Sequence, residues 1–269
     1  MRPFNHTLGI DDFKTLNALT VGYGALEGTY QIIEKAYQGY IISLGSPQLK
    51  AVGLSAVQRI CMHKVYEGGA KKFGLNWISQ LRSVQLGSCP MCGNSTLGTV
   101  EHYLPKTPFP EFSVLSWNLV PSCNVCNQKR GSKHVNGIKH HLLHPIFDRL
   151  LLEKLKLLTC FDNSTAVTQY SLGFNDTAFS AGERDRIVAH IKMCVDRRAF
   201  NLSTNVQISK IAARVAQERI SRWKTLIQKE LDLMDDAYVG CGWEASCLRG
   251  LLNVDVAQLR TIIEPKLLK

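Results

Sequence analysis

The chain has 269 residues, of which 45% are hydrophobic and 20% charged, and its formal net charge is +10. No apolar run approaches the roughly 18–20 residues that cross a bilayer, and the opening MRPFNHTLGIDDF lacks the apolar core of a secretory signal. These features argue against a membrane or secreted protein and favour a soluble, cytoplasmic protein with a polyanionic partner such as nucleic acid.

The first segment, residues 1–86, is predicted to be mainly helical. TYQIIEKAYQGYII and KKFGLNWISQLRS have helical spacing of apolar residues. Between them, Ser46-Pro47 places a capping residue before a proline, and Gly68-Gly69 would end a helix. We therefore expect a helix from about Pro47 to Gly68.

The second segment, residues 87–150, contains four closely spaced cysteines. Residues 99–104 have strand-like content, and Pro105, Pro108 and Pro110 then favour an irregular connection. This segment is the predicted functional core.

The third segment, residues 151–269, is predicted to begin with two short strands, KLKLLTCF and AVTQYSLGF. Ser180 and Glu183 have the spacing of a capping box and start a helix. A long helix over 204–236 and a last helix, DVAQLRTIIE, closed by Pro265, would follow. The expected fold class is α+β, mainly helical, with helical segments on both sides of the core.

The cysteines form two Cys-x-x-Cys pairs, which favour a metal clamp. A tetrahedral zinc ion takes four thiolates at about 2.3 Å, and a closed set of four makes the ion structural. Two disulfides or two reduced pairs are the alternatives, which an intracellular protein makes less favourable. The expected zinc ligands are Cys89, Cys92, Cys123 and Cys126.

Polar residues between and beside the cysteine pairs suggest catalysis. His102 can take a proton from an attacking water at neutral pH. Glu101 and Asn127 offer oxygen atoms of the kind that Mg²⁺ or Mn²⁺ prefers. Adjacent residues on a strand point to opposite sides, however, so spacing alone does not make Glu101 and His102 one site.

VEHYLP and WNLVPSCNVCNQKRGSK closely resemble the HNH endonuclease family over residues 89–147. The resemblance implies a zinc-stabilised ββα-metal core, in which His102 is the general base and Glu101 the acidic metal ligand. It also implies that Asn118 braces the loop that holds the base. Asn127 would be a second metal ligand, or else merely cap the helix that carries it.

Basic residues after the second cysteine pair are candidates for phosphate contact. Lys129, Arg130 and Lys133 follow Asn127 closely and are predicted to bind DNA. His144 is a further candidate for the active site, although it suits equally a turn before Pro145.

The layout of an HNH core between helical segments is also similar to nuclease subunits of bacterial anti-phage systems, some of which work with a separate ATPase. The sequence thus predicts a metal-dependent DNA endonuclease in anti-phage defence, with a partner ATPase. The alternative is a zinc-stabilised nucleic-acid-binding or scaffold subunit without hydrolytic activity.

Overall fold

The computed structural model describes residues 1–5, 9–68, 73–133, 135–136, 140–164, 168–236 and 241–267. Over these residues the chain is mainly helical with three small antiparallel sheets, which confirms the α+β, mainly helical class. The helices are α1 (Asp12–Gly22), α2 (Tyr30–Ile42), α3 (Ala56–Gly68), α4 (Asn76–Ser83), α5 (Asn124–Arg130), α6 (Arg149–Lys154), α7 (Ala181–Cys194), α8 (Arg197–Val215), α9 (Trp223–Asp236), α10 (Trp243–Asn253) and α11 (Val256–Leu267). The strand pairs are β1 (Thr99–His102) with β2 (Leu119–Ser122), β3 (Val135–Asn136) with β4 (His140–His141), and β5 (Leu157–Asp162) with β6 (Gln169–Phe174).

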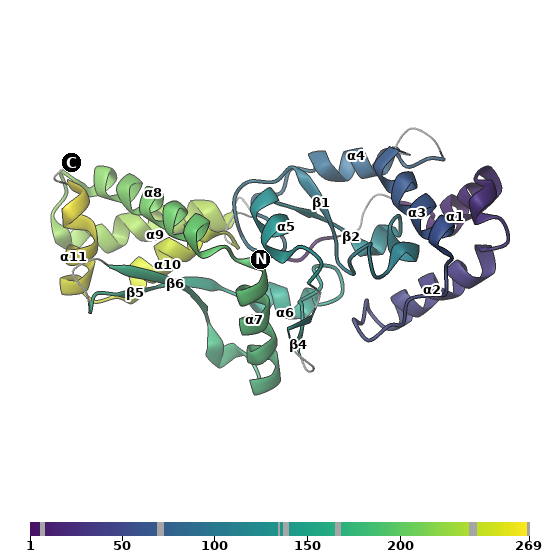
Figure 1. Cartoon of the computed structure of the whole chain (residues 1–269). Helices are drawn as coiled ribbons and strands as arrows, with labels where there is room; N and C mark the ends of the chain where they lie inside the picture. Colours follow the sequence, from purple (N-terminus) through teal and green to yellow (C-terminus); the bar gives the residue numbers. More distant parts are fainter. Residues whose placement is uncertain are drawn as a thin grey trace.

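The elements form an elongated arrangement with the β1–β2 hairpin and α5 near its middle (Figure 1). Helices α1 to α3 lie on one side, and α8 to α11 with the β5–β6 hairpin lie on the other. One cluster of buried apolar side chains nevertheless extends from Leu16 in α1 to Ile263 in α11. The three sequence segments thus contribute to a common core. Within the described ranges, no helix is long and apolar enough to span a membrane.

The third helix begins nine residues later than the sequence predicted. Pro47 lies in a turn, and α3 starts at Ala56. Ser55 and Gln58 form a reciprocal cap, because the Ser55 amide donates to Gln58 Oε1 (2.8 Å) and the Gln58 amide donates to Ser55 Oγ (3.3 Å). This S-x-x-Q capping box satisfies two amides that a helix start leaves without partners, and it outweighs the Ser-Pro signal.

The predicted long helix over 204–236 is wrong, because two helices occupy this range. Helix α8 ends at Val215, and α9 begins at Trp223 after an extended Arg219 and a short 3-10 turn. The Trp223 indole donates to the Glu218 carbonyl at 3.1 Å and fixes the turn. Both helices keep apolar residues at helical spacing, so the pattern alone does not reveal the break.

Of the other predictions for the third segment, two are confirmed and the predicted end of the last helix is wrong. The β5–β6 hairpin and the Ser180–Glu183 capping box of α7 are confirmed. The last helix does not end before Pro265 but runs through it to Leu267, so the lost backbone donor falls in the final turn. Helix α10, which was not predicted, packs on β5, where a Cβ on Gly250 would lie only 2.1 Å from the Thr159 carbonyl oxygen.

Candidate active site and metal centre

The β1–β2 hairpin and α5 follow one another in the order strand, strand, helix. The two strands pair without a bulge, with Thr99 opposite Ser122 and His102 opposite Leu119. Cys123 is the N-cap of α5, and its Sγ accepts from the Cys126 amide at 3.3 Å. The second cysteine pair therefore starts the helix that carries Asn127.

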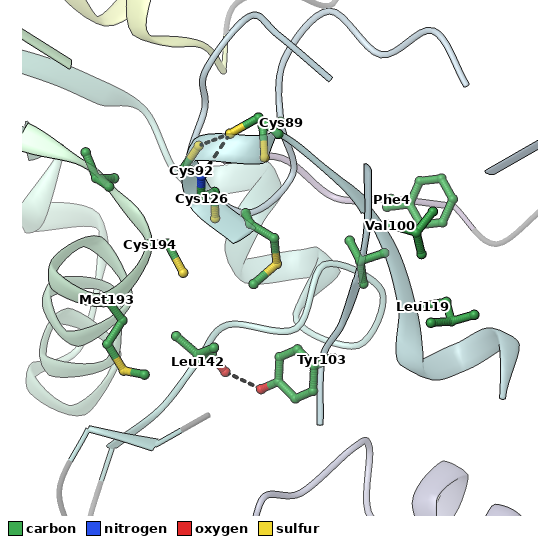
Figure 2. Close-up of a cluster of buried hydrophobic side chains, with 14 of the residues drawn as sticks. Phe4, Cys89, Cys92, Val100, Tyr103, Leu119, Cys126, Leu142, Met193 and Cys194 are labelled. Atoms are coloured by element: carbon green, nitrogen blue, oxygen red, sulfur yellow. Dashed lines mark hydrogen bonds between the residues drawn. The ribbon is translucent and has the colours of Figure 1, made fainter. Parts of the chain in front are cut away.

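The structure brings the four predicted zinc ligands together. The Sγ atoms of Cys89, Cys92 and Cys126 all lie within 4.8 Å of one another (Figure 2). Cys123 Sγ is 3.5 Å from Cys92 Sγ, and all four side chains are buried. A tetrahedral zinc ion with thiolates at about 2.3 Å needs sulfur atoms about 3.8 Å apart. Cys89, Cys92 and Cys126 therefore lie close enough together to share one metal ion, and Cys123 is close to Cys92.

The backbone around the first cysteine pair also suits a metal. Gly93 has a φ of +87°, which favours glycine, and its amide donates to the Cys89 carbonyl at 2.9 Å. The Asn94 amide points at Cys92 Sγ, at 3.5 Å. Like the Cys126 amide at Cys123, it stabilises negative charge on sulfur.

A fifth thiol, Cys194 at the end of α7, lies against this cluster. It is buried and interacts with the Cys126 thiol, and Figure 2 shows where Cys194 lies relative to the labelled cysteines. His190, one turn earlier, hydrogen-bonds the Met91 carbonyl through Nε2 at 2.5 Å. The sequence placed Cys194 in the apolar core and did not reveal that α7 packs on the cysteine cluster.

Three of the predicted catalytic residues line one cavity of about 280 Å³. Glu101 and His102 come from β1, and Asn127 comes from α5. His102 is the last residue of its strand, and both neighbours reach the same cavity although they are adjacent in sequence. The remaining lining residues are Tyr66, Val100, Pro105, Lys106, Thr107, Gly131 and Ser132.

His102 is held by two contacts. Its Nε2 is 3.0 Å from the Ser113 carbonyl oxygen, and its ring packs edge-on against Tyr66 at 4.4 Å between centroids. Because a carbonyl only accepts, Nε2 carries the proton and Nδ1 is the ring's acceptor. Burial lowers the pKa of His102 to about 4, so the imidazole is neutral at pH 7. Nδ1 is therefore the ring nitrogen of His102 that can accept a proton.

Glu101 forms a buried ion pair with Arg130. The Arg130 guanidinium is wholly buried and also donates to the His102 carbonyl, to Tyr103 O (3.0 Å) and to Lys133 O (3.3 Å). Burial lowers the pKa of Arg130 to about 10, which still leaves it charged at neutral pH. The prediction that Arg130 contacts DNA is therefore wrong: the side chain is directed inward because it neutralises Glu101 and satisfies backbone carbonyls around the hairpin.

The two predicted DNA-contacting lysines lie in different surroundings. Lys129 does not line the 280 Å³ cavity, and its ammonium donates to the Val195 carbonyl after α7. Lys133 is exposed beyond the end of α5. Lys106, which the sequence analysis did not single out, lines the cavity and pairs with Glu67 at 2.6 Å. The sequence signal that could have identified Lys106 is its position directly after VEHYLP.

Asn118 is fully buried and ties together the connection between β1 and β2. Its Oδ1 accepts from the Leu104 amide (2.7 Å) and the Tyr40 hydroxyl (3.0 Å). Its Nδ2 donates to the carbonyls of Leu104 (3.0 Å) and Phe112 (3.1 Å). The loop so held contains Ser113, whose carbonyl orients His102, so Asn118 acts on the ring through this loop.

His144 does not line the cavity that contains His102. Its side chain is buried, its Nδ1 accepts from the amides of Ile146 (3.2 Å) and Phe147 (3.5 Å), and its Nε2 contacts the Tyr40 hydroxyl at 3.1 Å. Burial lowers the pKa of His144 to about 3. A catalytic role for His144 is therefore not supported, because both ring nitrogens have partners within the core. Through Tyr40 the ring instead supports Asn118.

Asn127 lies within α5 and is half-buried. The N-cap is Cys123, so the alternative in which Asn127 merely caps the helix is wrong. Its backbone amide donates to the Cys123 carbonyl at 3.1 Å, and its position in the first turns of α5 places it at the cavity.

Comparisons with known proteins give a short similarity. The chain is 40% identical over 63 residues to the protein ea31 of Escherichia phage lambda. The match covers 23% of this chain, and the chain spans about a fifth of the length of ea31 (21%). No protein-family model matches the chain, and no solved structure matches it.

Proposed function

We propose that this protein is a metal-dependent nuclease of the HNH type that hydrolyses phosphodiester bonds in DNA. The observation that carries the proposal is that Glu101, His102 and Asn127, which come from a strand and a helix, line one cavity. The strand–strand–helix order around them and the sequence resemblance to HNH endonucleases support it. A chain charge of +10 favours a polyanionic substrate.

His102 is the proposed general base. With Nε2 held by the Ser113 carbonyl, Nδ1 is the atom that takes a proton from the attacking water. Burial holds the pKa of His102 at about 4, although the hydrogen bond with the Ser113 carbonyl raises it in part. A phosphate bound in the cavity would raise this pKa, and a divalent ion at Glu101 would lower it, because negative charge favours the imidazolium and positive charge disfavours it. The Tyr66 ring and the Ser113 carbonyl keep the imidazole in place during the transfer.

Glu101 and Asn127 are the proposed ligands of Mg²⁺ or Mn²⁺. Both donors are oxygen atoms, and such an ion is usually bound by one or two carboxylates together with water and substrate phosphate. Arg130 contacts Glu101 through Oε1, so Oε2 is the remaining carboxylate donor. When bound, the ion would supply charge neutralisation at the phosphate and the leaving oxygen.

The four-cysteine cluster is the proposed structural zinc site. Its sulfur atoms are buried and close to one another, and their two knuckles flank the β1–β2 hairpin in sequence. Four thiolates leave no open position for water, so the ion would stabilise the fold and take no part in hydrolysis. The cluster would thereby fix the start of α5, and with it Asn127.

The layout similar to anti-phage nuclease subunits suggests a cytoplasmic defence protein that works with an ATPase. Co-expression with neighbouring genes, followed by purification of this chain, would show whether an ATPase is retained on it. If the chain purifies from such a strain without an ATPase, the proposed partnership is contradicted.

A non-hydrolytic nucleic-acid-binding or scaffold subunit is the second candidate. The observation that favours it is the Glu101–Arg130 pair, because Arg130 already neutralises the carboxylate on which a catalytic metal would depend. In that case the cavity would be a remnant of an active site, and the zinc cluster would stabilise a binding surface.

A cleavage assay with plasmid DNA separates the two candidates. The purified chain is incubated with supercoiled plasmid in Mg²⁺, in Mn²⁺ and without divalent ion. We expect ion-dependent nicking or linearisation that falls on the order of 100-fold or more in Asn127→Ala, because one of two protein ligands is lost. Gln128→Ala, an exposed neighbour on α5, is the matched control and should keep its rate. Metal-independent cleavage, or equal rates in both variants, would exclude the proposed site, and protein that binds DNA without cutting it would favour the second candidate.

A further inference from the structure

A second, larger cavity of about 580 Å³ lies between β6 and the helices α7 and α8. Lys129 of α5 lines it, whereas Asn127 of the same helix lines the smaller cavity. The two cavities therefore adjoin the same seven-residue helix. Neither the sequence motifs nor the proposed hydrolysis accounts for this second cavity.

Three cations line the second cavity. Lys192 on α7 and Arg197 on α8 are exposed, and Arg197 contacts Gln169 Oε1 at 3.2 Å. Lys129 is half-buried and directed towards the Val195 carbonyl. Among the described residues, none of the side chains that line this cavity is acidic. The lining of the cavity therefore favours anions.

Apart from Ser171, the remaining wall consists of apolar and aromatic residues and includes three aromatic rings. Phe200 is almost fully buried and packs at 87° against Trp243, with 5.6 Å between centroids. The Tyr170 hydroxyl is fixed by Asn205 Oδ1 at 3.0 Å. Phe174 is half-buried at the cavity and offers part of its ring to a ligand. Because Phe200 and Tyr170 are held by the core, the wall is preformed.

We propose that this cavity binds a nucleotide, with the base against the aromatic wall and the phosphate at Lys192 and Arg197. A small inorganic anion would leave the apolar wall without a partner, and a purely apolar ligand would make no use of the cations of Lys192 and Arg197. A ligand with a flat ring and a phosphate satisfies both parts. The volume lies in the range of small-molecule sites, about 300–1,000 Å³.

A flat ring with a phosphate is present both in a free mononucleotide and in each nucleotide of a single strand. Cations that follow a backbone and aromatic rings that take bases are also how proteins bind single-stranded nucleic acid. The site does not depend on hydrolysis, so it is tested in the His102→Ala variant without divalent ions. If the protein shows no nuclease activity, the nucleotide-binding inference is unaffected. If no nucleotide binds, the proposed nuclease activity is likewise unaffected.

Isothermal titration calorimetry tests the inference with four probes: AMP, ATP, a short oligo-dT and inorganic phosphate. We expect AMP, ATP or the oligonucleotide to bind at one site, and Lys192→Ala/Arg197→Ala to weaken this binding on the order of tenfold or more, since charge-assisted hydrogen bonds to phosphate are lost. Lys35→Ala/Arg198→Ala is the matched control: both residues are exposed, neither lines the cavity, and the net charge changes equally.

Phe174→Leu distinguishes the contribution of the base to binding from the contribution of the phosphate. It keeps an apolar side chain but removes the ring, so it should weaken nucleotide binding and leave the binding of inorganic phosphate unchanged. Binding of AMP or ATP identifies a free nucleotide as the ligand, and binding of oligo-dT alone identifies a strand. The inference is overturned if no nucleotide probe binds, if both double variants lose affinity equally, or if inorganic phosphate binds as tightly as the nucleotides.

Discussion

The buried pair between Glu101 and Arg130 makes a prediction about stability that follows directly from the structure. Arg130→Met keeps much of the side-chain volume but removes the charge and the donors to three backbone carbonyls. The Glu101 carboxylate would then remain buried without its partner. Breaking a buried pair from one side costs about 3–5 kcal/mol, so we expect a loss of this size in the free energy of unfolding.

The loss is measured by guanidinium denaturation followed by tryptophan fluorescence, with zinc present throughout. Arg149→Met is the control, because Arg149 pairs with Glu153 on the surface of α6 and such pairs contribute about 0.5 kcal/mol or less. In Glu101→Gln/Arg130→Met the combined cost should fall below the sum of the single costs by roughly 1–3 kcal/mol, because the unpaired charge is gone. A cost for Arg130→Met no larger than that of the surface control would refute the inward role of Arg130.

Three further predictions concern other buried groups. Asn118→Ala should lower the free energy of unfolding by about 3–4 kcal/mol in thermal or chemical denaturation, since several buried backbone groups lose their partner; an effect below 1 kcal/mol would contradict the bracing role. Burial raises the pKa of Asp12 to about 6, so the folded state binds a proton more tightly than the unfolded state and the contribution of Asp12 to stability falls as pH rises from about 4 to 6. In Asp12→Asn, Oδ1 still accepts from the Ser116 amide, and Nδ2 donates to Ser116 Oγ in place of the oxygen that accepted from it. The variant should gain about 3 kcal/mol relative to the wild type between about pH 3 and pH 7; parallel stability curves would contradict this. Metal analysis should find one zinc per chain, lost in Cys126→Ser but kept in the exposed Cys160→Ser; a metal-free wild type would remove the clamp.

The sequence predicted the features that depend on local spacing. Each Cys-x-x-Cys pair is a short turn with fixed ligand positions. The two pairs can therefore come together if the chain between them is long enough to bring the second pair back to the first. The Ser180–Glu183 box was readable for the same reason, since its hydrogen bonds lie within four residues. The positions of Glu101 and His102 on a short strand, and of Asn127 on a helix after the second cysteine pair, also followed from local pattern.

The direction of long side chains was not readable from the sequence. Arg130 and Lys129 looked like surface cations beside a nucleic-acid site, but each is drawn to carbonyls or a carboxylate far away in the chain. His144 likewise acquires its role from Tyr40, which is 104 residues distant. Such partners are set by how α2 and α7 pack on the core, and no periodicity reports this packing.

The break between α8 and α9 was missed for a related reason. An apolar stripe at helical spacing continues through both helices, and the intervening residues contain neither glycine nor proline. The turn depends on the indole of Trp223 reaching back to the Glu218 carbonyl. A tertiary contact therefore decides where the helix stops.

The role of His102 is tested most directly by comparing plasmid cleavage in His102→Ala with the wild type at equal Mg²⁺ or Mn²⁺. Loss of the base predicts a rate lower by about 10²–10⁴-fold. His63→Ala is the control, because His63 bonds the Lys106 carbonyl at 2.8 Å but does not line the cavity, and its rate should stay close to that of the wild type. Cleavage by folded His102→Ala at the wild-type rate would contradict the proposed active site.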